Sequence, residues 1–301
     1  MVGSVEFGIY LPQLAYTADQ LLERALLCEE LGFSSLWLMD HLYPPELPAV
    51  PSLEGWTLAT WLLARTSRLR LGHLVLSNTF RHPVVLAKMA TSLDVLSGGR
   101  LDLGLGSGSY GPEHVAAGIP FPALGIRSGD LDAALATVRS MFAGDGPVAN
   151  LPAPVQPGGP PLHIGGANER YTLPIVARWA DVWNCPASAI DVYDRKWAVL
   201  EELCRSAGRD PAALRVSQQA VLVLTASAAA VPDALARAER RYGGPGWGLH
   251  AGGFIGTPDQ VIPVIQRHVD RGVSLFIFAT WDRAAPETLG LLAEEVLPAF
   301  S

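Results

Sequence analysis

Short runs of apolar, β-branched and aromatic residues alternate along the chain with longer amphipathic segments. This alternation is typical of repeated strand–helix units. The predicted strands are Val5–Tyr10, Ser35–Leu38, Leu69–Leu76, Leu101–Leu105, Leu162–Ile164, Asp181–Asn184, Val216–Leu224 and Val273–Phe278. The predicted helices are Thr17–Leu31, Gly55–Thr66, Val84–Leu96, a segment from Arg127 to about Met141, Glu169–Ala180, Tyr193–Ala207, Ala229–Arg241 and Pro258–Arg271.

Residues that cap or stop helices support these boundaries. Thr17 with Gln20 three residues later has the pattern of a capping box, and Gly32 follows that helix as a stop. Gly144–Pro161, rich in Gly, Pro and Ala, is interpreted as a long connection and not as a linker between domains. Open doubly wound sheets usually have fewer than eight strands, so the pattern favours an α/β fold of the (β/α)8 TIM-barrel type. We expect one such domain over residues 1–301, with inserted loops.

Composition agrees with a barrel and narrows the class of partner. The 301 residues are 49% apolar and 17% charged, which excludes a coiled coil and a disordered chain. The net charge of −7 and the lack of a basic cluster argue against nucleic acid. No run reaches the ~18 apolar residues of a membrane helix, and the N-terminus has no leader pattern. We therefore expect a cytoplasmic protein that binds neither nucleic acid nor membrane.

Cysteine and lysine usage excludes several kinds of chemistry. Cys28, Cys185 and Cys204 are too few and too scattered for a disulfide framework. Neither cysteines nor histidines show metal-site spacing, so no metal is expected. The two lysines, Lys88 and Lys196, fall inside predicted helices, which disfavours a Schiff-base aldolase.

In a (β/α)8 barrel the chemistry lies at the C-terminal ends of the strands. Asp40 and Glu113 are the only obvious pair of carboxylates near such ends, so a glycosidase has little support. Aromatic side chains, amides and hydroxyls are more frequent there, and they suit a planar, uncharged ring system. The residues at these ends are Leu11, Asp40-His41, Ser77–Arg81 with Phe80, Gly106–Ser109, Gly165–Asn168, Trp183-Asn184 and Thr280-Trp281.

Two of these loops have the glycines of an anion-binding loop. Gly106-x-Gly108 and Gly165-Gly166 let backbone N–H groups approach a ligand closely. The second opens into a predicted helix, whose N-terminus favours a phosphate. The alternative is that these glycines only make tight turns between strand and helix.

His41 is the best candidate for proton transfer, because a neutral imidazole donates or accepts a proton near neutral pH. Asp40 beside it is placed to restrain the loop. The alternative is a histidine that is hydrogen-bonded into the rim of the barrel.

A set of motifs, in order along nearly the whole chain, resembles the bacterial luciferase-like superfamily of flavin- and deazaflavin-dependent proteins. The block Ser97-Gly-Gly-Arg100-Leu followed by Gly104-x-Gly-x-Gly108 is fairly specific, and the ordered set is more so. The remaining motifs are Met39-Asp40-His41, Thr79-Phe-Arg-His-Pro83 with Lys88, Asp94, Glu113, Pro161-Leu-His-Ile-Gly-Gly166, Ala180-Asp-x-Trp183-Asn184 and Gly256-Thr-Pro258.

The resemblance implies a (β/α)8 barrel that binds FMN or its 5-deaza analogue, coenzyme F420. It also implies a non-prolyl cis peptide in the third strand, by position Leu74–Val75, which pushes a backbone bulge against the ring of the cofactor. The cofactor phosphate would be held by the loops after strands four and five. The implied cofactor-binding residues are Asp40, Leu74, Val75, Ser107, Gly108, Gly165, Gly166, Ala167 and Asn168.

Asp40-His41, Thr79–Arg81 and the loop from Gly165 to Glu169 look more like the deazaflavin-dependent members. In the sugar-phosphate dehydrogenases of that subgroup, a histidine matching His41 lies beside the reactive carbon of the ring. A glutamate of the strand-four loop is their acid partner, and Ser109 stands in its place here. In those enzymes lysines bind the phosphate of the substrate. The strand ends of this sequence have no lysine, so a sugar-phosphate substrate is disfavoured.

The leading hypothesis is an F420-dependent oxidoreductase that transfers a hydride to or from a small organic substrate. His41 would exchange the proton, and Glu113 would orient or bind the substrate if its loop folds inward. The aromatic residues expected to line the substrate pocket are Trp56, Phe80, Trp183 and Trp281. One alternative is a reduced-FMN monooxygenase, and another is a barrel that binds cofactor without catalysis, as the loss of the acid at Ser109 suggests. The resemblance implies a homodimer and leaves room for a partner enzyme that reduces the cofactor.

Overall fold

The computed structural model describes residues 5–244 and 247–300. The sequence predicts a loop over the glycine-rich segment Gly243–Gly253, and Pro245 and Gly246 of that segment lie outside the described residues. The described strands are β1 (Glu6–Tyr10), β2 (Ser35–Leu38), β3 (Arg70–His73), β4 (Leu76–Ser77), β5 (Leu101–Gly106), β6 (Leu162–Gly165), β7 (Val182–Pro186), β8 (Arg215–Leu224), β9 (Ile255–Gly256) and β10 (Val273–Thr280). The described α-helices are α1 (Ala18–Glu30), α2 (Gly55–Leu63), α3 (Pro83–Ser97), α4 (Gly111–Ala117), α5 (Leu124–Ala143), α6 (Thr172–Trp179), α7 (Tyr193–Ser206), α8 (Val231–Tyr242), α9 (Pro258–Val269) and α10 (Pro286–Leu291).

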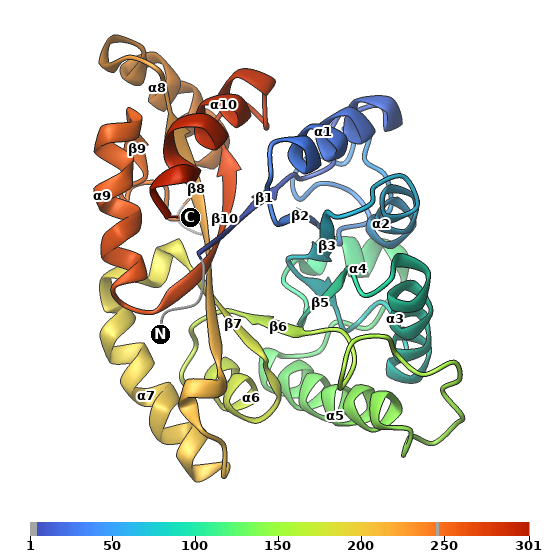
Figure 1. The fold of residues 1–301 in the computed structure, drawn as a ribbon. Coiled ribbons are helices and arrows are strands. Elements are labelled where there is room, and N and C mark those ends of the chain that lie inside the picture. Colours follow the sequence, from blue (N-terminus) through green and yellow to red (C-terminus); the bar gives the residue numbers. More distant parts are fainter. Residues whose placement is uncertain (1–4, 245–246, 301) are drawn as a thin grey trace.

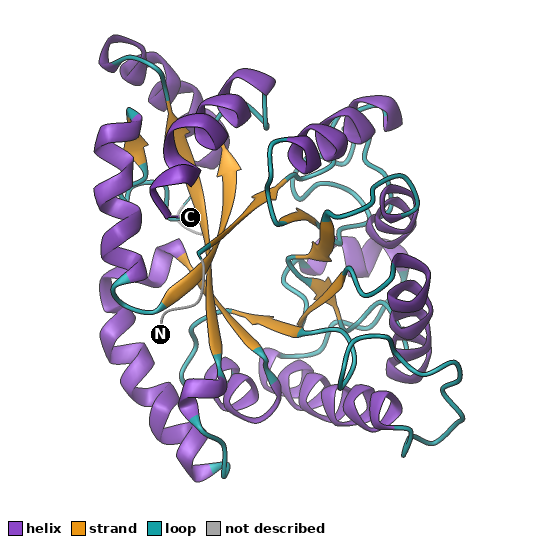
Figure 2. Ribbon diagram, viewed as in Figure 1, coloured by secondary structure: helices purple, strands orange, loops and turns teal. Residues whose placement is uncertain are grey.

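The strands form a closed parallel barrel with helices around it (Figures 1 and 2). Neighbours follow the order β10-β1-β2-β3-β5-β6-β7-β8, and β8 pairs with β10 to close the ring. The first and last strands of the barrel, β1 and β10, pair with each other, with Gly8 opposite Ile277 and Ile9 opposite Phe278. The predicted (β/α)8 barrel is therefore confirmed. No helix in the described ranges is both long and apolar enough to cross a membrane.

Most predicted boundaries are close to the observed ones, and three differences bear on the ligand site. Leu69–Leu76 is not one strand, because the strand is interrupted between β3 and β4, where the Leu74–Val75 peptide is cis. The segment 110–125, for which the sequence predicts neither a strand nor a helix, contains α4. The helix expected from Glu169 begins at Thr172. The capping box of Thr17 and Gln20 is confirmed.

The Ser97-Gly-Gly-Arg100 motif stabilises the junction between α3 and β5. Gly98 ends α3 in the left-handed conformation, with φ at 66°. Arg100 then donates to the backbone carbonyls of Leu63 and Leu69, both at the end of the preceding strand–helix unit. Asp94, fully buried in α3, accepts from two backbone N–H groups of the connection that contains Gln156. This motif therefore serves the fold and not the ligand site.

The indole of Trp37 fills the centre of the barrel. It is fully buried, and its Nε1–H donates to Ser35 Oγ at 2.9 Å. Glycines of the two flanking strands make room for it, because a Cβ on Gly72 would lie 2.5 Å from the ring and one on Gly8 would lie 2.9 Å from Nε1. The imidazole of His163 meets the indole edge-on, with ring centroids 4.7 Å apart. Trp37 thus closes the barrel beneath its C-terminal end.

A charged cluster occupies the opposite, N-terminal end. A cavity of about 220 Å³ is lined there by Arg70, Asp102 and His163, among others. Arg70 donates to both carboxylate oxygens of Asp102, at 2.8 and 2.9 Å, and the Nε2 of His163 lies 3.3 Å from one of them. Burial raises the pKa of Asp102, but the hydrogen bonds and charges of His163 and Arg70 outweigh burial and lower it to about 2.

Substitution of Gly72 by Ala should destabilise the barrel, because the added methyl group has no room beside the Trp37 ring. We expect the free energy of unfolding to fall by about 1–3 kcal/mol. The matched control is Gly129→Ala, at an exposed position of α5 where nothing lies within 4 Å of the new Cβ. There the higher helix propensity of Ala should raise stability by ~0.5–1 kcal/mol. Urea unfolding measures both, and equal stability of the two variants would contradict the packing argument.

Acid should weaken the fold through Asp102. Because its folded-state pKa lies below the ordinary value of 3.8, its stabilising contribution is complete above about pH 5 and is lost as pH falls through about 2. The contribution amounts to roughly 2 kcal/mol. Asp102→Asn should flatten the decline of the unfolding free energy between pH 5 and 2. An unchanged slope would show that other carboxylates dominate acid unfolding.

Candidate active site

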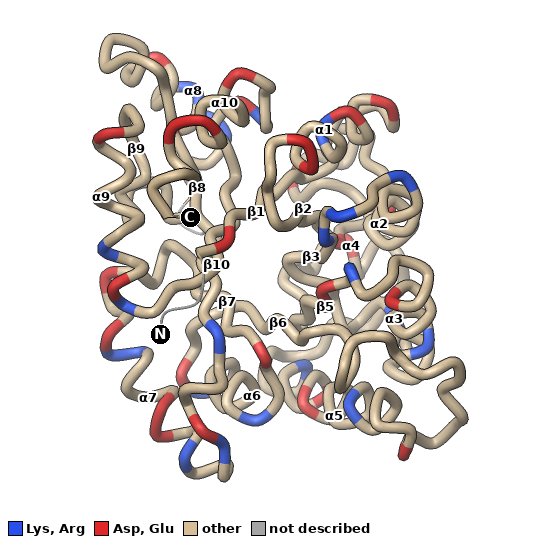
Figure 3. Tube along the Cα trace, viewed as in Figure 1, with Lys and Arg blue, Asp and Glu red and all other residues tan. Residues whose placement is uncertain are grey.

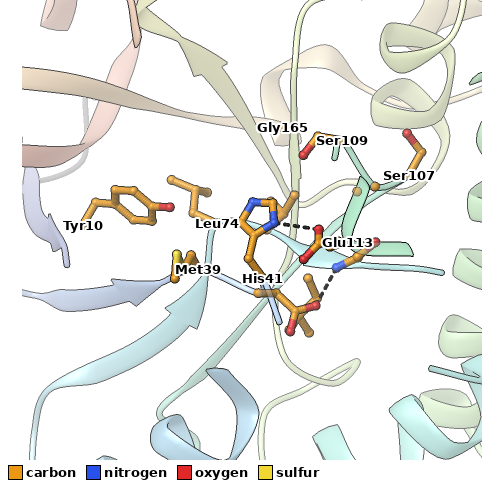
Figure 4. A pocket seen from close by; sticks show the side chains of 14 residues that line it. Tyr10, Met39, His41, Leu74, Ser107, Ser109, Glu113 and Gly165 are labelled. Atoms are coloured by element: carbon orange, nitrogen blue, oxygen red, sulfur yellow. Dashed lines mark hydrogen bonds and ion pairs between the residues drawn. The ribbon is translucent and has the colours of Figure 1, made fainter. Parts of the chain in front are cut away.

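A cavity of about 260 Å³ opens at the C-terminal end of the barrel (Figure 4). The ends of β1 and β2, the break between β3 and β4, the loop after β5, α4 and the end of β6 supply its walls. The lining residues are Tyr10, Met39, Asp40, His41, Leu74, Val75, Leu76, Ser77, Gly106, Ser107, Gly108, Ser109, Glu113 and Gly165.

The structure brings the two predicted catalytic residues together. Figure 4 shows Glu113 of α4 pointing at His41, which follows β2. Glu113 Oε1 lies 2.8 Å from His41 Nδ1, and Glu113 Oε2 accepts the backbone N–H of Leu42 at 3.0 Å. The Glu113 side chain is 2% exposed and that of His41 is 23% exposed. The loop that carries Glu113 therefore folds inward, and the carboxylate partner of His41 comes from position 113 and not from Ser109.

This contact fixes which nitrogen of His41 is free. A carboxylate accepts only, so the Nδ1 of His41 carries a hydrogen that Glu113 binds. In the neutral imidazole the lone pair then lies on Nε2, on the other side of the ring. His41 can accept a proton at Nε2, and its imidazolium form can donate one from the same atom.

Asp40 lines the cavity but its charge is already matched. Its two oxygens accept from Arg81 at 2.7 and 2.8 Å, and one also accepts the backbone N–H of Ser77 at 2.8 Å. Arg81 also donates to the carboxylate of Glu54, the N-cap residue of α2. Asp40 therefore fixes the loop after β4 to the end of β2. Its effect on a ligand would pass through the position of that loop.

The backbone between β3 and β4 bulges toward β5. The peptide Leu74–Val75 is cis, at the position that the sequence resemblance implies. Glycines of β5 accommodate the bulge: a Cβ on Gly104 would lie 1.9 Å from the carbonyl oxygen of His73, and one on Gly106 would lie 2.6 Å from Val75 Cγ2. Leu74 and Val75 remain half-buried and line the cavity.

The predicted phosphate loops reach the cavity only in part. Ser107, Gly108 and Gly165 line it. Gly166 is engaged with β7, since its N–H donates to the Asn184 carbonyl at 3.1 Å and its carbonyl accepts Trp183 Nε1 at 2.8 Å.

Ala167 and Asn168 follow Gly166 outside the lining residues. The side-chain oxygen of Asn168 accepts the N–H groups of Arg170 and Tyr171. The N–H groups of the turn before α6 are thereby hydrogen-bonded within the chain. The prediction that the second glycine loop opens directly into a helix is therefore wrong, because α6 begins only at Thr172.

The predicted aromatic residues lie outside the lining of this cavity. Trp183 is fully buried and stacks on Tyr193, on the outer side of β7. Trp56 stacks on His73 with ring centroids 5.7 Å apart and belongs to the core beneath α2. Phe80 stacks on His114, and Trp281 donates from Nε1 to the Leu224 carbonyl. These four rings shape the surroundings of the cavity and not its surface.

Sequence reasoning missed Tyr10 as part of the site. Figure 4 shows it across the cavity from His41, beside Met39. Burial, aided by the phenol of Tyr242, raises the pKa of Tyr10, so its hydroxyl remains protonated. A signal existed in β1: Phe7 and Ile9 face the helices, so the last residue of the strand faces the interior.

The described residues contain no group of three or more His, Cys, Asp or Glu side chains arranged to hold a metal ion. The three cysteines are buried and unpaired, and burial raises the pKa of the Cys28 and Cys185 thiols to about 12. Basic and acidic residues are interspersed over the outer helices and loops (Figure 3). The candidate chemistry is therefore concentrated in His41, Glu113 and the cavity that they border.

Comparison with known proteins finds relatives of the chain in both sequence and structure. Over 148 residues the chain is 35% identical to an F420-dependent glucose-6-phosphate dehydrogenase of Microbacterium testaceum. That alignment covers 48% of this chain and 43% of the relative, so the chain matches less than half of the relative's length.

Solved structures share the fold over almost the whole chain. An F420-dependent secondary alcohol dehydrogenase in complex with an F420–acetone adduct aligns with a TM-score of 0.82, at 18% identity and 99% coverage of both chains. Monooxygenase RslO1 of Streptomyces bottropensis aligns with a TM-score of 0.78, at 23% identity, covering 98% of this chain and 100% of that one. The model of the luciferase-like monooxygenase family matches residues 5–251, and the chain belongs to that family.

Proposed function

We propose that the protein is an F420-dependent oxidoreductase that transfers a hydride between the deazaflavin and a small, uncharged organic substrate. The observation that carries the proposal is the His41–Glu113 pair at the edge of a glycine-lined cavity. The sequence relative and the alcohol dehydrogenase of similar fold are both described as F420-dependent, which supports the choice of cofactor.

Glycines of β5, β6 and the loop after β5 form one wall of the cavity, where their missing Cβ atoms leave room for the β3–β4 segment. Gly106, Gly108 and Gly165 line the cavity, and each lies close to the β3–β4 segment: a Cβ on Gly108 would meet Ser77 Oγ at 2.8 Å, and one on Gly165 would meet Val75 at 3.7 Å. At the cavity itself, a glycine backbone without a side chain would also let a planar ring come close. Leu74 and Val75 would contact one face of the ring, and Ser107 and Gly108 would lie near its polar chain.

Coenzyme F420 supplies an acceptor or donor of a hydride, and the protein supplies position and proton transfer. In oxidation of an alcohol, His41 Nε2 accepts the hydroxyl proton as the carbon loses its hydride. In the reverse direction the imidazolium returns that proton to the oxygen of the reduced carbonyl. Glu113 stabilises the imidazolium and holds its ring in place, so both steps use the same atom of His41.

The charges around the cavity favour a substrate without phosphate. The lining residues include no lysine or arginine. The amine of Lys196 bonds to Glu169 at 2.7 Å, and Lys88 bonds to the carbonyl of Leu151. A sugar phosphate, the substrate named for the sequence relative, would therefore lack a cationic partner here. A secondary alcohol, a ketone or an activated C=C or C=N bond fits better.

We also propose a homodimer in the cytoplasm that relies on a partner enzyme to reduce its cofactor. Family membership supports this part of the proposal.

Reduced-FMN monooxygenation is the second candidate, supported by the similar fold of a monooxygenase. A barrel that binds cofactor without catalysis is less consistent with the site, since His41 has a carboxylate partner despite the serine at position 109.

Titration of the purified protein with oxidised F420, and separately with FMN, tests the cofactor. We expect F420 fluorescence to change on binding, with a dissociation constant at least tenfold lower than that for FMN. Preference for FMN would overturn the deazaflavin assignment and direct the next assay to oxygen consumption with reduced FMN. Binding of neither would overturn the proposed function.

His41→Ala should lower turnover by about 10²–10⁴, the usual contribution of a general acid or base, and change F420 affinity by less than about threefold. Glu113→Gln should lower turnover by at least about tenfold, because the amide leaves the imidazolium without its countercharge. The matched control is His250→Ala, an exposed histidine that pairs with Glu239 and is not among the residues that line the cavity. Steady-state kinetics against a panel of alcohols and ketones, with binding measured in parallel, separates the two effects. Equal loss of binding and turnover in His41→Ala would contradict its role in proton transfer.

A further inference from the structure

The next residue of α4 after Glu113 is a second histidine of this region. His114 is fully buried, and its ring lies between those of Phe80 and Phe121, with centroids 4.7 and 4.3 Å away. Its position between two aromatic rings leaves only the two ring nitrogens for polar contacts. Both nitrogens have a partner, and one partner leads back to the cavity.

A chain of short hydrogen bonds runs from His114 to the cavity wall. His114 Nδ1 lies 2.7 Å from the backbone carbonyl oxygen of Tyr110, and Nε2 lies 2.6 Å from Thr79 Oγ1. Thr79 Oγ1 lies 2.6 Å from Ser77 Oγ. Ser77 lines the cavity.

Each hydrogen in this chain has one consistent place when His114 is neutral. The carbonyl of Tyr110 accepts only, so Nδ1 carries the hydrogen and Nε2 has the lone pair. Thr79 must then donate to Nε2, which uses its single hydroxyl hydrogen. Two hydroxyl oxygens 2.6 Å apart need a hydrogen between them, so Ser77 donates to Thr79. The cavity is left with the lone pairs of Ser77 Oγ.

We propose that His114, acting through Thr79, fixes the Ser77 hydroxyl as a hydrogen-bond acceptor toward the ligand. The pair is a positioning device that makes this wall of the cavity specific for a donor group. The proposal rests on the proposed function for the identity of the ligand, where the donor would be a ring N–H or a hydroxyl of the polyol chain. The direction of the chain itself depends only on the protein.

The surrounding charges leave the chain undisturbed. Glu113, the next residue, points to His41, and Asp40 binds the backbone N–H of Ser77 and not its hydroxyl. The guanidinium of Arg127 lies on Phe121, 3.7 Å from the ring centroid. The phenol of Tyr110 is turned away and accepts the N–H of Glu46 at 3.2 Å.

Gly108 keeps the space that the two hydroxyls need. It has φ at 83°, and a Cβ there would lie 2.8 Å from Ser77 Oγ and 3.4 Å from Thr79 Oγ1. The glycine that allows a ligand to approach thus also leaves room for the acceptor hydroxyl to lie at the cavity wall.

The tautomer of His114 is measured first, on ¹⁵N-labelled protein without ligand, by long-range ¹H–¹⁵N correlation of the imidazole rings at pH 8. His114→Gln assigns the signal by its disappearance. We expect the Nδ1–H form, which is the minor tautomer of free histidine. The Nε2–H form would overturn the proposal, whatever the cofactor proves to be.

Binding of F420 then tests the role of the chain in a double-mutant cycle. Thr79→Val and Ser77→Ala should each weaken binding by about tenfold, the effect of one lost hydrogen bond, and the double variant should lose no more than either single one. Thr79→Ser is the matched control, which keeps the hydroxyl and should bind within about twofold of the original protein. Additive losses, or a loss in Thr79→Ser equal to that in Thr79→Val, would overturn the proposal.

The two measurements separate this inference from the proposed function. If the protein binds FMN and not F420, the same cycle is run with FMN as the probe. If it binds neither, the proposed function fails, while the tautomer of His114 still decides the direction of the chain. If Thr79→Val does not fold, as judged by circular dichroism, Ser77→Ala and Thr79→Ser with the tautomer measurement decide the outcome.

Discussion

The site depends on a buried carboxylate that must be paired where it lies. Glu113 is almost completely shielded from solvent, and a charge in that position is costly unless hydrogen bonds compensate for the lost water. His41 Nδ1 and the N–H of Leu42 supply those bonds. The pairing connects the end of β2 to α4, two elements that are 72 positions apart in the sequence. It also sets the free nitrogen of His41, so this one contact both joins two parts of the cavity wall and fixes the nitrogen that the proposed proton transfer would use.

The barrel could be predicted from the sequence because each strand and helix carries its own pattern. Buried parallel strands are short apolar runs, and those runs predicted all eight strand positions of the barrel. The same criterion could not find the break in Leu69–Leu76, because hydrophobicity is continuous through Leu74 and Val75 and says nothing about the direction of a carbonyl. Helix α4 was missed for a related reason. It has seven residues with a glycine and a proline at its start, and its stability comes from contacts that Glu113 and His114 make elsewhere.

Site residues could be predicted where it is enough to know that a residue follows the end of a strand. They could not be predicted where the direction of the side chain matters. His41 follows the end of β2, which places it at the catalytic end of the barrel. The sequence predicts Trp183 at the end of its strand, but β7 continues to Pro186 and the indole packs on Tyr193 outside the barrel. The amide of the next residue, Asn184, donates to Ser217 of β8. One step along a strand exchanges the inner for the outer face. The choice between Ser109 and Glu113 as partner of His41 is of the same kind, because the turn that starts α4 brings only the second to the imidazole.

The charged groups that reach the cavity are matched within the protein before any ligand arrives. Asp40 has Arg81, and Glu113 has His41. With little net charge left to attract an ionic substrate, selectivity must come from shape and from the direction of hydrogen bonds. Shape is set by glycines and by the Trp37 indole that closes the barrel below. Direction is set by groups whose hydrogens are already committed, the imidazole of His41 through Glu113 and the hydroxyl of Ser77 through Thr79. A ligand with the wrong donor or acceptor would leave one of these buried groups unsatisfied, and that penalty exceeds the gain from one additional contact.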